Sequence, residues 1–532
     1  MNSLYLSSYQ GMAGMQGTQR KEWIGLSLVC LMALFLLFFR LGERSLWEDE
    51  ARVVFKSGWD FGDLALFQKN LVFNSIVSTW SQLGKTEFWL RTPSALFAFF
   101  SLLVCYELGK KFLSSPLSLL ATFLLGTSPF FLFESRQVKA YSLAILFSLL
   151  SIHFLIRFLE TGQRGDLVSH LGAVFIALLT HYMFLGLYSA QLIFVCGHWK
   201  QNPRRVREYF VALFLASLPS FLIILGLLGH LNILAELYFH PKAPEPFSFP
   251  LGYFGKMAFV YYLFAVGPTV FPWKILWVLP GCLLPLLLLL YSLKSFSRPH
   301  FTLLILAFMG PIFLLAALRN AQPHHTLLSL PFYIFLVVTG LSHFGPFLKR
   351  LLLVGLLVMN AYGLTNYFLG RQYLFITHLE PYREITQWVI AHFQKGDLLL
   401  HSQRNLAFQY YFTLLYENGG PARRLHATDK NGMIHLKTWE ELEQRFPSHT
   451  RRIWFIERSP GQFIDGQTPI PDVEKFYRET VAFRTLLDSR FRRLGRWTFL
   501  EDPDVEKKKR FLRKFYVKDR IVVSLYDLKA PL

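Results

Sequence analysis

Long apolar runs recur along the first two thirds of this 532-residue chain, and no other feature constrains its fold as strongly. A helix needs roughly 20 apolar residues to cross the ~30 Å of hydrocarbon in a bilayer, and many of these runs approach that length. Hydrophobic residues make up 53% of the chain, which is too apolar for an ordinary soluble protein. The sequence therefore predicts a polytopic α-helical membrane protein with about eleven transmembrane helices. The predicted spans are 22–40, 90–108, 116–133, 140–158, 167–180, 182–198, 208–229, 275–293, 301–318, 326–343 and 347–369.

The basic residues orient these spans. Residues 167–198 are compatible with one long helix or with two short helices that meet at "THY", and residues 253–272 with a span or an interfacial helix. If 167–198 crosses twice and 253–272 does not cross, six basic clusters all fall on one side, as the positive-inside rule requires. They lie at 20–21, 110–111, 157–164, 200–207, 294–298 and 349–350. The N-terminus is then cytoplasmic, and the chain that follows the last span lies outside.

The remaining third of the chain has ordinary polarity. In it, "PYREITQWVIAHF" has the period of an amphipathic helix, while "GDLLLHS", "RRIWFIE" and "RIVVSLYDL" are typical of buried strands. We therefore expect a C-terminal soluble α/β domain. The predicted domains are a cytoplasmic tail (1–21), a transmembrane catalytic domain (22–370) and a soluble extracytoplasmic domain (371–532).

Charge and cysteine content exclude other classes of protein. The net charge of +20 is explained by basic cytoplasmic loops and by attraction to anionic lipid, and no zinc-finger or helix-turn-helix pattern accompanies it. We therefore expect no nucleic-acid partner. All four cysteines lie inside apolar runs, so neither a disulfide framework nor a cysteine metal site is expected.

Three consecutive acids follow the first span in "SLWEDEAR", residues 45–52. Glu48, Asp49 and Glu50 could form a solvated turn. Alternatively, an amphipathic helix lying on the membrane surface would hold them at membrane level, where ionisable groups are usually functional.

Three further polar segments fall on the same predicted outer side. "FESRQVKAYSL" (133–143) carries basic residues that could bind a lipid phosphate or simply extend to the membrane surface. His181 stands alone between two apolar runs, where a structural role is as reasonable as a catalytic one. "LRNAQPHHTLLSLP" (318–331) contains an adjacent His pair, for which anion binding at a helix N-terminus is favoured over metal binding.

The order of these motifs resembles the GT-C membrane glycosyltransferases that use polyprenyl-phosphate sugars. This group includes dolichyl-phosphate-mannose protein mannosyltransferases and lipid A aminoarabinose transferases (glycosyltransferase family 39). The resemblance covers roughly residues 22–370. The motifs that carry it are "SLWEDEA", "EFWLRTPSALF", "SRQVKAYSL" and "THY".

The chain departs from the family's pattern at several positions. "KNL" (69–71) replaces Pro-Pro-Leu, Gln137 replaces an acid, and Lys139 replaces an arginine. His324-His325 replaces Arg-Tyr, although the following "LLSLP" keeps the family's spacing. Loss of the second acid argues against a metal site. No metal ligand is therefore assigned, and a divalent cation stays an open question.

The resemblance implies an inverting transfer of a sugar from a polyprenyl-phosphate donor to a glycan, lipid or protein on the outer face of the membrane. Asp49 would be the general base and Glu50 would position it or the acceptor, whereas Glu48 occupies a variable position. The residues assigned to substrate binding are Arg91, Lys139, Tyr141, His181, Arg319, His324 and His325. The expected location is the bacterial inner membrane, with membrane lipids and the lipid-linked donor as partners.

Two other functions compete with this interpretation. One is a lipid or glycolipid transporter or flippase, which the sequence does not favour because it shows no internal repeat and no matched pair of broken helices. The other is a catalytically degenerate paralogue.

The basic segment 507–520 would rest on anionic headgroups or form a solvated helix.

Overall fold

The computed structural model describes residues 2–57, 70–228, 251–297, 300–318, 322–374, 376–394, 396–401, 406–416, 450–460, 482–501 and 518–531. The chain divides into two compact units. The helical unit comprises residues 1–41, 60–240 and 249–372, and the sheet unit comprises 42–59, 241–248 and 373–532. The "SLWEDEAR" segment therefore belongs to the same unit as the C-terminal third of the chain.

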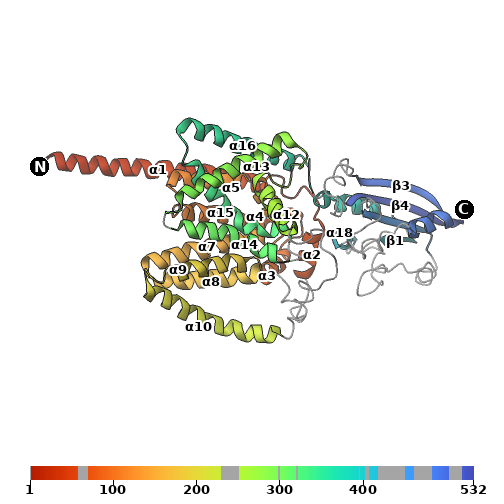
Figure 1. Ribbon diagram of the computed structural model, residues 1–532. Helices are drawn as coiled ribbons and strands as arrows, with labels where there is room; N and C mark the ends of the chain where they lie inside the picture. Colours follow the sequence, from red (N-terminus) through yellow and green to blue (C-terminus); the bar gives the residue numbers. More distant parts are fainter. Residues whose placement is uncertain are drawn as a thin grey trace. The chain divides into compact units, whose positions relative to one another are not determined.

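The helical unit is built almost entirely of helices (Figure 1). Each predicted span coincides with a helix or with a consecutive pair of helices. The elements are α1 (Asn2–Phe38), α3 (Leu71–Ser81), α4 (Glu87–Gly109), α5 (Ser115–Gly126), α6 (Pro129–Ser135), α7 (Tyr141–Thr161), α8 (Arg164–Thr180), α9 (Phe184–Gly197), α10 (Pro203–Leu228), α12 (Leu251–Ala265), α13 (Ile275–Ser292), η2 (Leu293–Ser295), α14 (Phe301–Ala317), η3 (Pro323–Ser329), α15 (Leu330–Leu341) and α16 (Pro346–Phe368).

Among the described residues, six helical segments are long and apolar enough to cross a membrane. The number becomes seven if the bent pair α5–α6 counts as one span. A predominantly helical membrane protein is therefore confirmed, whereas eleven crossings stay a prediction. The segment predicted as either a span or an interfacial helix contains α12, whose residues 254–265 form a shorter apolar helix.

Two breaks in the helices place polar residues at helix ends. Helix α8 ends at Thr180 and α9 begins at Phe184, so residues 167–198 form two helices that meet at "THY", one of the two predicted alternatives. His181 closes α8 in an extended conformation. Helices α5 and α6 bend by 58° where they join. The Ser128 hydroxyl, which accepts from the Phe131 N–H, then starts α6.

Close packing between α9 and α14 depends on two glycines. A Cβ on Gly186 would lie 2.5 Å from the Gly310 carbonyl oxygen, and a Cβ on Gly310 would lie 2.3 Å from the Gly186 oxygen. Both distances are far below van der Waals contact. The two backbones therefore touch directly, as small residues allow in membrane helix pairs.

The sheet unit contains a four-stranded sheet of order β1-β2-β4-β3. Strands β1 and β2 are parallel, and the β2–β4 and β4–β3 pairs are antiparallel. The strands and helices agree with the predicted α/β layer. They are α2 (Glu48–Ser57), η4 (Ile376–Leu379), α17 (Tyr382–His392), β1 (Asp397–His401), α18 (Leu406–Tyr416), β2 (Arg452–Pro460), β3 (Phe491–Glu501) and β4 (Lys518–Pro531), with a further helical stretch at 482–490.

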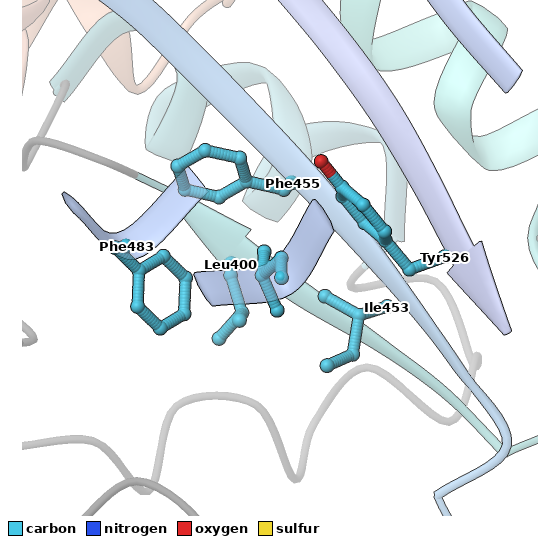
Figure 2. Close-up of a cluster of buried hydrophobic side chains, with 6 residues drawn as sticks. Leu400, Ile453, Phe455, Phe483 and Tyr526 are labelled. Carbon is cyan, nitrogen blue, oxygen red and sulfur yellow. The ribbon is translucent and has the colours of Figure 1, made fainter. Parts of the chain in front are cut away.

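Alternation along the strands creates a core on one face of this sheet (Figure 2). Ile453 and Phe455 are two residues apart on β2 and therefore point to the same face, where β4 contributes Tyr526. Phe483 and Leu487, four residues apart in the helical stretch, cover that face, and all five side chains are buried. This packing gives the sheet unit a hydrophobic core of its own.

Candidate functional site

The three acids of "SLWEDEAR" form the first turn of α2. Carboxylates are favoured there because the helix dipole and the exposed N–H groups attract negative charge. The Glu50 carboxylate accepts a hydrogen bond from the Trp47 N–H at 3.3 Å, which is a capping contact. Glu48 forms an ion pair with Arg52 at 3.2 Å. The structure therefore gives Glu50 a structural role and Glu48 a surface partner, and Asp49 is half-buried.

Residues of the C-terminal third hold the chain that leads into α2. The buried Leu46 N–H donates to the Tyr411 hydroxyl on α18 at 2.6 Å. The Ser45 hydroxyl donates to the Glu384 carboxylate on α17 at 2.7 Å, and the ring of Trp47 lies 4.2 Å from that of His378. Sequence reasoning missed these contacts, since no local pattern links residues more than 300 positions apart.

The hydrogen bonds at Glu384 affect its ionisation. Burial by itself would raise the pKa of this carboxyl group. Hydrogen bonds from Ser45 and Arg383 outweigh burial, so the pKa of Glu384 is lowered from its ordinary value of 4.5. Glu384 is therefore an anionic anchor for the segment that precedes Asp49.

A cluster of rings in the helical unit joins residues from three helix junctions. We call Tyr141, His181, Tyr182, His324 and His325 the imidazole cluster. The Tyr141 ring lies 5.3 Å from His181 and 5.7 Å from His324. The His325 ring lies 4.6 Å from His324 and 5.5 Å from His181. Lys139 places its ammonium group 5.5 Å from the centre of the Tyr141 ring, which is a cation–π contact.

The start of η3 is capped by its own side chains. The Nδ1 atom of His325 accepts from the Gln322 N–H at 3.1 Å, and the Gln322 side chain accepts from the His325 N–H in return. This reciprocal pair is a capping box. Two of the donors on which anion binding at this helix N-terminus would depend are therefore already engaged.

The charged residues between α6 and α7 are buried. Lys139 is only 8% exposed and Arg136 5%, so neither side chain extends to a surface of the unit. Arg136 donates to the Phe39 carbonyl and lies over the ring of Phe368 at 4.9 Å, contacts that suit a structural role. Gln137, which replaces the family's acid, donates to the Phe133 carbonyl at 2.9 Å.

Arg91 lies in the first turns of α4 and is also buried. It donates to the Leu41 carbonyl at 3.0 Å and so holds the end of the segment that follows α1. On the same helix, the Ser94 hydroxyl donates to the Lys139 carbonyl at 3.2 Å. These contacts connect α4 to the α6–α7 junction.

The predicted site residues thus fall into three sets. Lys139, Tyr141, His181, His324 and His325 come together in the helical unit, with Arg91 on a helix that contacts the same junction. Asp49 and Glu50 belong to the sheet unit. Arg319 lies outside the described residues. Within the described ranges, no group of three or more His, Cys, Asp or Glu residues is arranged to hold a metal ion.

Comparisons with known proteins support the resemblance drawn from the sequence. Residues 68–225 match the family model described as dolichyl-phosphate-mannose-protein mannosyltransferase. No curated protein matches the chain.

Two solved structures share the fold. One is ArnT from Cupriavidus metallidurans in the apo state, with a TM-score of 0.58 and 13% identity, covering 95% of this chain and 98% of that one. The other is the same protein bound to undecaprenyl phosphate, with a TM-score of 0.57 and 11% identity, covering 94% and 98%. The resemblance to the GT-C group is thereby confirmed at the level of fold.

Proposed function

We propose that this protein is a membrane glycosyltransferase that moves a sugar from a polyprenyl-phosphate donor to an acceptor. The observation that carries the proposal is the buried Lys139 beside the imidazole cluster, in a chain that shares the fold of ArnT. ArnT binds undecaprenyl phosphate, and a lipid phosphate needs both an apolar environment and buried donors. The helical unit offers both.

The leaving group explains why these residue types are needed. As the bond from the sugar to the phosphate breaks, negative charge accumulates on the phosphate oxygens. Preorganised cations and N–H donors in a site of low polarity stabilise that charge more strongly than water does. Lys139 supplies the charge, while the histidines and Tyr141 supply donors. We include Arg91 and Arg319 as further phosphate-binding residues.

The acceptor hydroxyl is a poor nucleophile, and a carboxylate that takes its proton as the new bond forms would activate it. We assign this role to Asp49. Asp49 occupies the position that the resemblance to the GT-C group assigns to the acid that acts on the acceptor, and it lies half-buried in the first turn of α2. Glu50 would keep α2, and with it Asp49, in place. A single displacement of this kind inverts the anomeric carbon.

The proposed orientation follows from the distribution of basic residues, and the bacterial inner membrane is what the resemblance implies. We place the protein in a bacterial inner membrane with eleven crossings, a cytoplasmic N-terminus and the soluble C-terminal domain on the extracytoplasmic side. A lipid-linked donor on that side requires no nucleotide. The acceptor would be a glycan, a lipid or a protein.

Transfer is tested by incubating the purified protein, in lipid nanodiscs, with a panel of polyprenyl-phosphate sugars. Release of polyprenyl phosphate from one of them is the expected result. No release from any donor, even with candidate acceptors present, would refute the proposal. Movement of the intact donor across vesicle membranes without release would indicate a transporter instead.

The assignment of the base is tested with Asp49→Asn. Loss of a general base costs roughly 10²–10⁴-fold in rate, so transfer should fall by at least a hundredfold while expression stays normal. Glu48→Gln, one residue away on the same helical turn, is the matched control and should retain activity. Near-normal transfer by Asp49→Asn would refute the assignment.

A further inference from the structure

The contact between Tyr182 and His325 determines which proton the His325 ring carries. The Tyr182 hydroxyl lies 2.6 Å from His325 Nδ1, and the backbone N–H of Gln322 donates to the same nitrogen at 3.1 Å. A backbone N–H can only donate. Nδ1 must therefore accept, which makes the imidazole neutral, with its proton on Nε2.

Tyr182 strengthens this arrangement from a different part of the chain. It lies in the break between α8 and α9, 143 positions before His325, and its hydroxyl shares the single lone pair of Nδ1 with the Gln322 N–H. The hydroxyl oxygen would accept a hydrogen bond if Nδ1 carried the proton, but the Gln322 N–H that donates to this nitrogen excludes that tautomer. The cap of η3 and the Tyr182 contact thus select the same tautomer.

The selected tautomer gives His325 a donor of fixed direction. Nε2–H is on the side of the ring away from Tyr182 and Gln322, and the ring itself packs against His324 and His181 in the imidazole cluster. His325 therefore brings a hydrogen-bond donor, and not a positive charge, to the cluster beside Lys139. A neutral donor and a cation act differently on a phosphate. The donor forms a directional hydrogen bond to one phosphate oxygen, whereas the cation attracts the negative charge of the whole phosphate group.

We propose that Tyr182 is a positioning residue that holds His325 in its Nε2–H tautomer, so that His325 donates a hydrogen bond to the phosphate of the lipid carrier. This inference rests on the proposed function, because it requires a lipid-linked phosphate to bind in the helical unit. It separates the two adjacent histidines, which the sequence presents as equivalent. It also gives Tyr182 a role that acts through His325.

Two substitutions of His325 distinguish its proposed role as a hydrogen-bond donor to the phosphate from its role in the capping box of η3. The amide oxygen of Asn occupies nearly the position of Nδ1, so His325→Asn keeps an acceptor for Gln322 and Tyr182, whereas its amide N–H groups end short of the position of Nε2. A Gln in the same position can complete a capping box and also present an N–H group farther along the side chain, so His325→Gln keeps both. The two variants differ chiefly in whether a donor reaches the phosphate.

The measurement is the affinity of the purified protein in nanodiscs for undecaprenyl phosphate, with undecaprenol as the control that lacks the phosphate. A hydrogen bond to a charged group is worth about ten- to a hundredfold in affinity, so His325→Asn should weaken binding of undecaprenyl phosphate by that factor. His325→Gln should stay within about threefold of the parent. Neither substitution should change undecaprenol binding. Equal losses for Asn and Gln would overturn the proposed donor.

The role of Tyr182 is tested by a double-mutant cycle. Tyr182→Phe should weaken binding of undecaprenyl phosphate by about fivefold in the parent protein, the usual effect of one neutral hydrogen bond. It should have no effect in the His325→Asn background, since no donor then lies at the position of Nε2. Tyr188→Phe, the same change on α9, is the control and should have no effect in either background.

The outcomes distinguish the two proposals. If the parent protein binds undecaprenyl phosphate no better than undecaprenol and releases no product, the proposed function fails, and this inference fails with it. If the parent protein is active and Tyr182→Phe has the same effect in both backgrounds, Tyr182 has a general structural role, and only the positioning proposal is refuted.

Discussion

Tyr411→Phe removes a single oxygen atom and should loosen the segment that carries Asp49. The Tyr411 hydroxyl accepts the hydrogen bond from the Leu46 N–H at 2.6 Å, and Leu46 and Tyr411 are 0% and 2% exposed. Phenylalanine would fill the same space and leave the buried N–H without this acceptor. A buried donor left unsatisfied costs about 1–3 kcal/mol.

This loss of stability should make the segment around Leu46 open more often. Leu46 is the residue just before the cap of α2, so its N–H connects the start of that helix to α18. A change of 1–3 kcal/mol in local stability accelerates hydrogen exchange by roughly five- to 150-fold if exchange occurs through local opening. Amide exchange measured by mass spectrometry should rise in peptides that cover residues 44–52 and stay constant in peptides from α7.

The control for this experiment is Tyr188→Phe, which should change exchange in neither region. Transfer activity should decrease in Tyr411→Phe although the substituted residue carries out no chemistry, since α2 positions Asp49. Unchanged exchange at residues 44–52 would refute the reasoning, because it would mean that the Leu46 contact does not hold this segment.

Three further predictions concern charged groups. Lys139→Met should lower kcat/KM for the lipid-linked donor by about 10- to 150-fold, which is the effect of losing a hydrogen bond to a charged group. Lys139→Arg keeps the charge and should stay within about tenfold of the parent. Equal values for the two variants would contradict a role for the charge. The Asp397 carboxylate is 1% exposed and accepts hydrogen bonds from Arg452 at 2.8 and 2.5 Å and from the Trp454 indole at 2.8 Å. Asp397→Ala should therefore lower the free energy of unfolding of the sheet unit by about 3–5 kcal/mol. The measurement is proteolysis of this unit, which should begin at a lower urea concentration. Because the pKa of Glu384 is lowered in the folded protein, its contribution to stability is fully present above the ordinary carboxyl pKa of 4.5 and is lost as the pH falls through the lowered value. Urea unfolding from pH 7 to pH 3 should therefore depend less on pH in Glu384→Gln, and an identical pH dependence would contradict the assignment; the effect is small because the Glu384 side chain is 45% exposed.

The sequence by itself determined the long helices and three of the four strands in the described sheet, whereas β3 and α18 were not predicted. Hydrophobic runs of the length of a span identify helices because the backbone in lipid must satisfy its own hydrogen bonds. The four short segments of the C-terminal third were also identified correctly, since strand alternation and helix period differ locally. The break at "THY" was one of two alternatives, and helix ends at Thr180 and Phe184 decide between them.

Only the tertiary structure decided which groups the polar residues contact. In the sequence, Lys139 and Arg136 are equally compatible with phosphate binding and with extension to the membrane surface, and their burial excludes the second interpretation. Side chains from three separate helix junctions assemble the imidazole cluster, and the Leu46–Tyr411 contact spans 365 positions. The physical reason is that a local pattern encodes the period of an element and the face that it buries, whereas the partner of a buried polar group depends on which helices and strands pack together.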